Sequence, residues 1–223
     1  MKFVAFNGSP SGKTSATGHI IEAFLNGARR SGAEACCYHL CEYNIEQCRG
    51  CFSCWFRSPG RCVLKDDMLQ LLYAYQSADV VCFGSPVYSW NMTALLKNFV
   101  DRLVPLKSPL LMQKDGHFDM EDSQKRKQRY VTISNCGFPG ENNFDIIRAA
   151  FSICNPALEI YRNCGKLLVS KQPDAQDIVY QYLAVVEQAG YEFASAGVVS
   201  KETLAQLDSP LMSTTDYMKF LGM

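Results

Sequence analysis

Short apolar runs alternate with amphipathic segments along most of this chain, and this alternation constrains the fold most strongly. Runs with the length of a buried strand are expected at 2–6, 35–40, 79–84 and 130–135, and a fifth is expected within 158–169. Segments with apolar residues at helical spacing are expected between and after them, at 15–31, 68–77, 91–104, 145–153 and 174–196. Wholly apolar strands separated by helices favour a parallel sheet that is covered on both faces. The sequence therefore predicts an α/β protein with a doubly wound, five-stranded parallel sheet.

Three segments fall outside this alternation. Residues 41–61 form a loop-like insert that carries cysteines, and residues 106–129 form a polar excursion. The segment 200–223 has the pattern of a short helical extension, in which residues 217–221 are expected to dock or to take part in a dimer. A length of 223 residues suits one domain with an appendage. We therefore expect one domain over residues 1–199 and a helical C-terminal extension over residues 200–223.

The charge and hydropathy of the chain argue against two kinds of binding partner, nucleic acids and membranes. The chain has 22 basic and 22 acidic residues, whereas nucleic-acid-binding domains usually carry a basic excess. The apolar run at the N-terminus is too short for the core of a signal peptide, and no run approaches the ~20 residues of a membrane helix. We therefore expect a cytoplasmic protein with no nucleic-acid and no membrane partner.

The loop after the first strand has the composition of a phosphate-binding site. It joins a buried strand to a helix, and backbone N–H groups at a helix N-terminus attract an anion. The glycine spacing fits neither the P-loop nor the dinucleotide-binding pattern. A serine-rich capping turn is the alternative, and little positive charge is present, so neutral donors would hold a monophosphate. The candidate binding residues are Ser9, Ser11, Lys13, Ser15, Ala16 and Thr17.

The loops after the third and fourth strands offer room for a planar ring. Parallel sheets bind ligands beyond the carboxyl ends of their strands, where the strand order reverses. The third strand is followed by two aromatic residues beside a proline, although such aromatics are often packing residues. Asn91 is expected to cap the helix that comes next. The candidate ring-binding residues are Pro86, Val87, Tyr88, Ser89, Trp90, Asn135, Cys136 and Gly137.

Four cysteines in the insert and directly after it have a spacing typical of metal ligands. The chain holds eleven cysteines, and structural disulfides are rare in a reducing compartment. Cys48, Cys51 and Cys54 are separated by two residues each, as in a bacterial ferredoxin run, and Cys62 follows. A 4Fe–4S cluster is one interpretation of this spacing. Structural zinc, a redox-active thiol set and a loop without metal are the others.

Together, these pieces resemble the flavodoxin-like NAD(P)H-dependent FMN reductase family, in particular its iron–sulfur flavoprotein branch. The resemblance covers residues 1 to about 140. Ser11 and Ala16 depart from the family, which often has Arg and Asn there. The matching segments are Asn7-Gly8-Ser9-Pro10 with Ser15 and Thr17, the cysteine loop ending in Gly60-Arg61-Cys62-Val63-Leu64-Lys65-Asp66-Asp67-Met68, Gly84-Ser85-Pro86-Val87-Tyr88, and Lys97-Asn98-Phe99-Val100-Asp101-Arg102.

The resemblance implies a flavodoxin-like fold with bound FMN, a homodimer, and an oxidoreductase activity. It places the phosphate in the first loop and the flavin ring against the second and third loops. The implied reaction takes electrons from NAD(P)H and passes them to a flavin, quinone or protein acceptor. The alternative is an iron–sulfur flavoprotein that carries electrons through a 4Fe–4S cluster on the cysteine loop, and a zinc-binding module is a third possibility. Because the flavin carries the chemistry, no catalytic acid or base is assigned.

Overall fold

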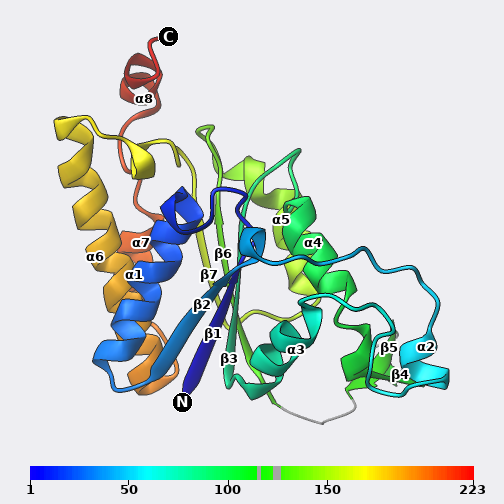
Figure 1. Ribbon diagram of the computed structural model, residues 1–223. Coiled ribbons are helices and arrows are strands. Elements are labelled where there is room, and N and C mark those ends of the chain that lie inside the picture. The colour runs from blue at the N-terminus through cyan, green and yellow to red at the C-terminus, as the bar shows by residue number, and fades with distance from the viewer. Residues whose placement is uncertain (115–116, 123–126) are drawn as a thin grey trace.

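A five-stranded parallel sheet forms the centre of the computed structural model, which describes residues 1–114, 117–122 and 127–223 (Figure 1). The strand order is β2-β1-β3-β6-β7, and every neighbouring pair in this sheet is parallel. This is the doubly wound order of flavodoxin-like proteins, so the predicted fold class is confirmed. The strands are β1 (Lys2–Asn7), β2 (Glu34–His39), β3 (Val80–Pro86), β6 (Arg129–Asn135) and β7 (Leu158–Arg162).

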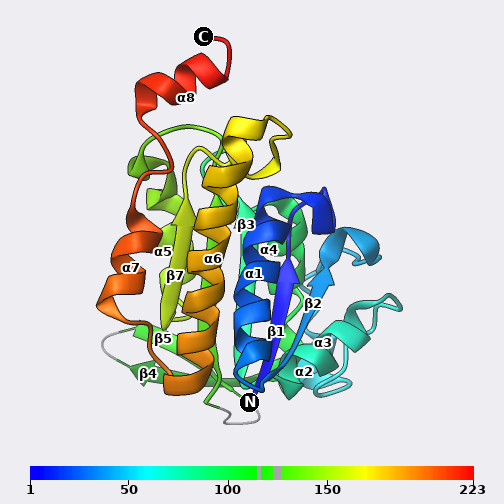
Figure 2. The same ribbon diagram turned by 90° about the vertical axis from the view of Figure 1, so that its left-hand side faces the viewer.

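Helices cover both faces of the sheet (Figures 1 and 2). One face packs against α1 (Ala16–Arg30) and α6 (Pro173–Ala196), and the other against α3 (Met68–Ser77), α4 (Ala94–Asp101) and α5 (Asp145–Ser152). Alternate residues of a strand point to opposite faces, so Phe3 packs with Phe24 on the first face and Phe6 stacks on Phe99 on the second. The two apolar cores fix the sheet between its helices.

Short elements complete the described chain. The insert holds one short helix, α2 (Ser53–Phe56), and the predicted excursion is an antiparallel ribbon of β4 (Lys107–Lys114) and β5 (His117–Asp122). No helix in the described ranges combines the length and the apolar character that a membrane crossing requires. Turns of 3-10 helix lie at Gly12–Thr14, Leu40–Glu42, Val104–Leu106, Glu141–Phe144 and Leu167–Val169.

One predicted helix cap is wrong. Thr93, not Asn91, caps α4, because its side chain accepts from the backbone N–H of Leu96 while Asn91 pairs with Tyr88 in a tight turn. The fifth strand lies within the predicted segment 158–169 and ends at Arg162, because the chain turns at Cys164, whose φ is +54°. Both features place additional loop residues at the C-terminal edge of the sheet.

The C-terminal segment forms two helices, α7 (Lys201–Asp208) and α8 (Thr214–Phe220). In both views α8 lies beyond the end of the molecule toward which the central strands point (Figures 1 and 2). It is attached there through Tyr217, whose fully buried hydroxyl donates a hydrogen bond to the carbonyl of Gly137 at 2.7 Å. The division of the chain into residues 1–199 and 200–223 remains a prediction.

Candidate functional site

The loops that follow β1, β3 and β6 surround one cavity of about 370 Å³ at the C-terminal edge of the sheet. Of the residues predicted from the sequence, Lys13, Ser89 and Trp90 do not line it. Thr14, Gly165, Lys166 and Val169 line it without having been assigned as site residues. The predicted residues that the cavity brings together are Ser9, Ser11, Ser15, Ala16, Thr17, Pro86, Val87, Tyr88, Asn135, Cys136 and Gly137.

The first loop is folded around the buried side chain of Asn7. Its Nδ2 donates to the carbonyl of Gly12 at 2.9 Å, and its Oδ1 accepts from the N–H of Ser9 at 2.9 Å. Gly12 has a φ of +53°, which favours glycine at this turn. Ser15 caps α1, because its Oγ accepts from the N–H of Gly18 at 2.9 Å. The first turn of α1 and several hydroxyl groups therefore line the cavity. This arrangement is suited to binding an anion.

Buried hydrogen bonds join this loop to the other two. Thr93 donates through Oγ1 to the carbonyl of Gly8 at 2.6 Å, which fixes the first loop to the start of α4. Asn135 donates through Nδ2 to Oγ1 of Thr17 at 2.6 Å, which connects the end of β6 to the first turn of α1. Both contacts are buried and link residues far apart in sequence, so the three loops form one preorganised wall.

The loop after β3 turns sharply and presents aromatic side chains. Tyr88 and Asn91 exchange two backbone hydrogen bonds of 2.9 and 3.0 Å around the residues Ser89 and Trp90. Those two residues have φ values of +47° and +63°, and neither is glycine, so the turn is strained. Tyr88 reaches the cavity, while Trp90 is 62% exposed and lies outside its lining. Strain of this kind is often found beside binding sites.

Lys166 carries the one charge among the described residues that line this cavity. The turn after β7 places it there, close to Gly137. No local pattern indicates a site residue there, because residues 158–169 are recognised only as the segment that holds the fifth strand. The remaining lining residues are hydroxyl-bearing, amide-bearing or apolar. A ligand with a phosphate and a flat ring fits this set of donors and walls.

The hydroxyl of Tyr217 positions the third loop. Burial raises the pKa of Tyr217 to about 12, so the hydroxyl stays a donor to Gly137 at neutral pH. We expect Tyr217→Phe to lower the unfolding free energy by about 1–3 kcal/mol, because the carbonyl of Gly137 loses its buried partner. It should also weaken binding in the cavity several-fold. Urea denaturation and ligand titration measure the two effects.

Tyr180→Phe is the matched control, since Tyr180 lies on α6 and is 77% exposed. It should behave as the wild type in both measurements. Equal behaviour of the two variants would contradict a role of Tyr217 in positioning the loop.

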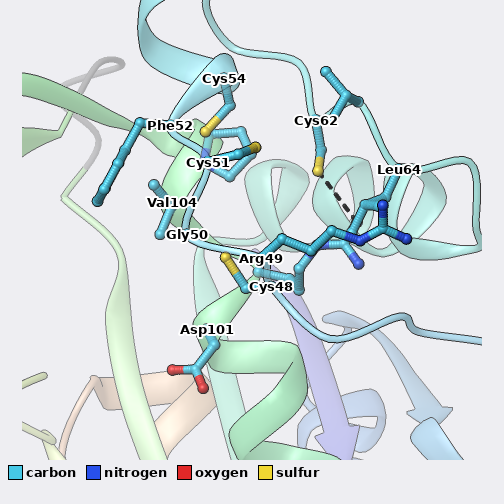
Figure 3. Close-up of a pocket in the computed structure, with 13 residues that line it drawn as sticks. Cys48, Arg49, Gly50, Cys51, Phe52, Cys54, Cys62, Leu64, Asp101 and Val104 are labelled. Atoms are coloured by element: carbon cyan, nitrogen blue, oxygen red, sulfur yellow. Dashed lines mark hydrogen bonds between the residues drawn. The ribbon is translucent and has the colours of Figure 1, made fainter.

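A second cavity, of about 300 Å³, is lined by the four cysteines of the insert, Cys48, Cys51, Cys54 and Cys62. Figure 3 shows their sulfur atoms facing a common space. Hydrogen bonds from Ser53 lower the pKa of Cys51, whereas burial raises the pKa of Cys54. Within the described residues, no three Cys, His, Asp or Glu side chains are placed to hold one metal ion.

The two metal interpretations require different arrangements of the sulfur atoms. Zinc requires its four ligands to converge on one point at about 2.3 Å. A 4Fe–4S cluster is held by thiolates on different iron atoms, so its ligands surround a volume rather than a point. Four thiols around a cavity fit the second case better.

A buried ion pair closes the base of the cysteine loop. Arg102 donates through Nη1 and Nη2 to the carboxylate of Asp66 at 2.6 and 3.1 Å, and the two side chains are 2% and 1% exposed. Burial alone would raise the pKa of Asp66, but the bonds from Arg102 and from the backbone N–H groups of Glu46 and Met68 lower it overall. Nη1 also donates to the carbonyl of Glu46, so the pair joins the two ends of the insert to α4.

The sequence matches both a protein-family model and individual known proteins. A family model described as NADPH-dependent FMN reductase matches residues 1–118. An iron–sulfur flavoprotein of Archaeoglobus fulgidus is 37% identical over 102 residues, which cover 46% of this chain and 48% of that protein. An iron–sulfur flavoprotein of Methanosarcina thermophila is 33% identical over 107 residues, covering 48% and 54%. The chain thus spans about half the length of the curated relatives it matches.

Solved structures show the same fold at low sequence identity. The NAD(P)H:quinone oxidoreductase of Methanothermobacter marburgensis aligns with a TM-score of 0.60 at 16% identity, covering 86% of this chain and 94% of that one. An FMN-dependent NADH-azoreductase of Bacillus anthracis in complex with FMN aligns with a TM-score of 0.61 at 15% identity, covering 86% and 99%. These likenesses extend the flavodoxin-like fold over most of the chain.

Proposed function

This chain belongs to the NADPH-dependent FMN reductase family, and we propose that it is an FMN-dependent oxidoreductase. In this proposal it takes electrons from NAD(P)H and passes them to a flavin, quinone or protein acceptor. One observation carries the proposal: the three loops beyond β1, β3 and β6 share a cavity with a helix N-terminus in its wall. A bound flavin would supply hydride and single-electron chemistry, and the protein would supply binding and orientation.

The residues of the cavity divide into two groups by chemistry. The hydroxyls of Ser9, Ser11, Thr14, Ser15 and Thr17, with the first turn of α1, would hold the phosphate as neutral donors. The apolar and amide groups of the second and third loops would support the ring. The ammonium group of Lys166 offers positive charge at the edge of the same cavity. This division follows the distribution of donors, and no acid or base is assigned.

Cofactor binding and reduction test the proposal directly. The full chain, mixed with FMN and desalted, should retain yellow absorbance, and its flavin fluorescence should change on binding. Under anaerobic conditions NADPH or NADH should bleach that absorbance, and an added quinone or free flavin should restore it. A protein that neither retains nor binds FMN would contradict the proposal. If the protein binds FMN but neither nucleotide reduces the bound FMN, the proposed function is limited to that of an electron carrier.

The cysteine cavity favours a second candidate function, an electron carrier with a 4Fe–4S cluster. Cys48, Cys51, Cys54 and Cys62 would hold the cluster, which supplies single-electron transfer when bound. The curated relatives named iron–sulfur flavoproteins support this candidate. Anaerobic purification with iron and sulfide assays separates the two candidates, because the reductase needs no iron. Roughly four irons and four sulfides per chain are expected for the carrier.

We further propose a cytoplasmic homodimer. Apolar side chains on the β4–β5 ribbon are exposed, and they include Leu110, Leu111 and Phe118. An exposed apolar patch of this kind suits an interface with a second copy. Light scattering of the purified chain gives its mass in solution. A monomer at micromolar concentration would contradict this part of the proposal.

A further inference from the structure

We propose that Arg102 is a positioning residue of the cysteine cavity, which acts through the sulfur of Cys62 and raises the reduction potential of a cluster held there. The proposal rests on the iron–sulfur interpretation given above. Arg102 lies in the wall of the cavity and is 2% exposed. Its Nη2 donates to Sγ of Cys62 at 3.5 Å, across 40 residues of sequence, along the dashed line in Figure 3.

The guanidinium is held in place by partners other than the sulfur. Asp66 accepts from both of its terminal nitrogens, and the carbonyl of Glu46 accepts from Nη1 at 2.6 Å. Asp66 is itself fixed by the backbone N–H groups of Glu46 and Met68. Arg102 therefore cannot turn away from Cys62 without breaking several buried bonds. The donor to the sulfur is preorganised by the fold.

The guanidinium also retains an unused donor. Nε of Arg102 is buried and has no hydrogen-bond partner in the described part of the chain. A buried N–H without an acceptor is costly, and such a group in a native structure calls for an explanation. The pairing with Asp66 explains the buried charge, but it does not explain a guanidinium that faces a cysteine. A role toward a sulfur-bound group accounts for the donor that faces Cys62.

Hydrogen bonds to ligating sulfurs are among the features that set the potential of an iron–sulfur cluster. A donor that faces the sulfur withdraws negative charge from it and favours the form that holds one more electron. Removing the donor should therefore move the midpoint potential to a more negative value. Arg49 lines the same cavity but pairs with Glu46 and is two-thirds exposed, with no bond to a sulfur. It provides a matched control.

The test compares Arg102→Lys with Arg49→Lys in the full chain. Each protein is reconstituted anaerobically with iron and sulfide, and its iron content is assayed. Each is then titrated with dithionite while the reduced signal is followed by electron paramagnetic resonance. Lysine keeps the charge beside Asp66, but its single nitrogen cannot serve Asp66, Glu46 and Cys62 together. We expect Arg102→Lys to retain its iron and to show a more negative midpoint potential, and Arg49→Lys to match the wild type.

A second variant keeps the test decisive if Arg102→Lys does not fold, as judged by circular dichroism. The double change Asp66→Asn with Arg102→Gln leaves no unpaired buried charge, and it should shift the potential in the same direction. A folded, iron-loaded variant with an unchanged potential overturns the proposal, as does a shift of equal size in Arg49→Lys. A wild-type protein that binds FMN but takes up no iron also overturns it, while the FMN assignment stands.

Discussion

Replacing Ala16 by aspartate is expected to remove tight FMN binding without loss of fold. Ala16 is the first residue of α1 and lines the cavity where the phosphate is proposed to lie. Two like charges about 4 Å apart repel by about 4 kcal/mol at an effective dielectric constant of about 20, so binding should weaken by roughly 100-fold or more. The same carboxylate should stabilise the helix by about 0.3–1 kcal/mol, because it lies at the positive end of the helix dipole.

Titration of each protein with FMN, followed by fluorescence, measures the affinity, and thermal unfolding without FMN measures the stability. Ala16→Asn is the control, since asparagine has nearly the shape of aspartate and no charge. It should bind FMN within a few-fold of the wild type. If Ala16→Asp and Ala16→Asn bind FMN equally well, the phosphate does not lie at this helix. The opposite signs of the two effects distinguish electrostatic repulsion from general damage to the fold.

Asp66→Ala is expected to have the largest effect on stability. The substitution leaves the guanidinium of Arg102 buried without its counter-ion, and breaking such a pair typically costs about 3–5 kcal/mol. Asp101→Ala removes the same charge from an exposed pair with Lys97 on α4 and should cost about 0.5 kcal/mol or less. Urea denaturation of the FMN-free proteins gives both values. A difference of less than about 1 kcal/mol between the variants would contradict a structural role for the buried pair.

The same pair gives the stability a defined pH dependence. The pKa of Asp66 in the folded protein lies below its ordinary value, so folding favours the ionised form. Its contribution is therefore complete above the unfolded pKa of about 3.9 and is lost as the pH falls through the lower folded value. The wild type should lose more stability between about pH 5 and pH 3 than the Asp66→Asn, Arg102→Gln double variant. Equal losses would show that other groups dominate the acid transition.

Local sequence patterns predicted the sheet and the helices well, for a physical reason. The apolar pattern of a buried strand or an amphipathic helix lies in consecutive residues, so it can be recognised in the sequence. The bounds of α3, for example, are those that its periodicity predicts. The place of the first loop beside the cavity was also predictable, because the loop joins the carboxyl end of a parallel strand to a helix. That it binds an anion stays a prediction. Lys13 is predicted at that site only because it belongs to the same loop. It does not line the cavity, whereas its neighbour Thr14 does.

Contacts between distant segments explain what the sequence did not reveal. The segment 158–169 was expected to hold the fifth strand, and its apolar residues Leu167 and Leu168, which are buried, gave no sign of the turn that carries Lys166. The bond from Arg102 to Cys62 and the bond from Tyr217 to Gly137 join segments 40 and 80 residues apart. No local pattern encodes such a pairing, because it depends on how the elements pack. The cysteine spacing indicated four thiols that line one cavity, but not the guanidinium beside them.

The attachment of α8 has a consequence for biosynthesis. Gly137 leaves the ribosome 80 residues ahead of the tyrosine that fixes it. At about 5–20 residues per second, the ribosome needs roughly 4–16 s to add that stretch. During that time the carbonyl of Gly137 lacks the Tyr217 donor, and the third loop is held by the backbone bonds of Cys136 and Phe138 to the turn after β7. Retention of FMN should accordingly be strongest after translation of α8, and stalled nascent chains that end before α8 should release FMN faster.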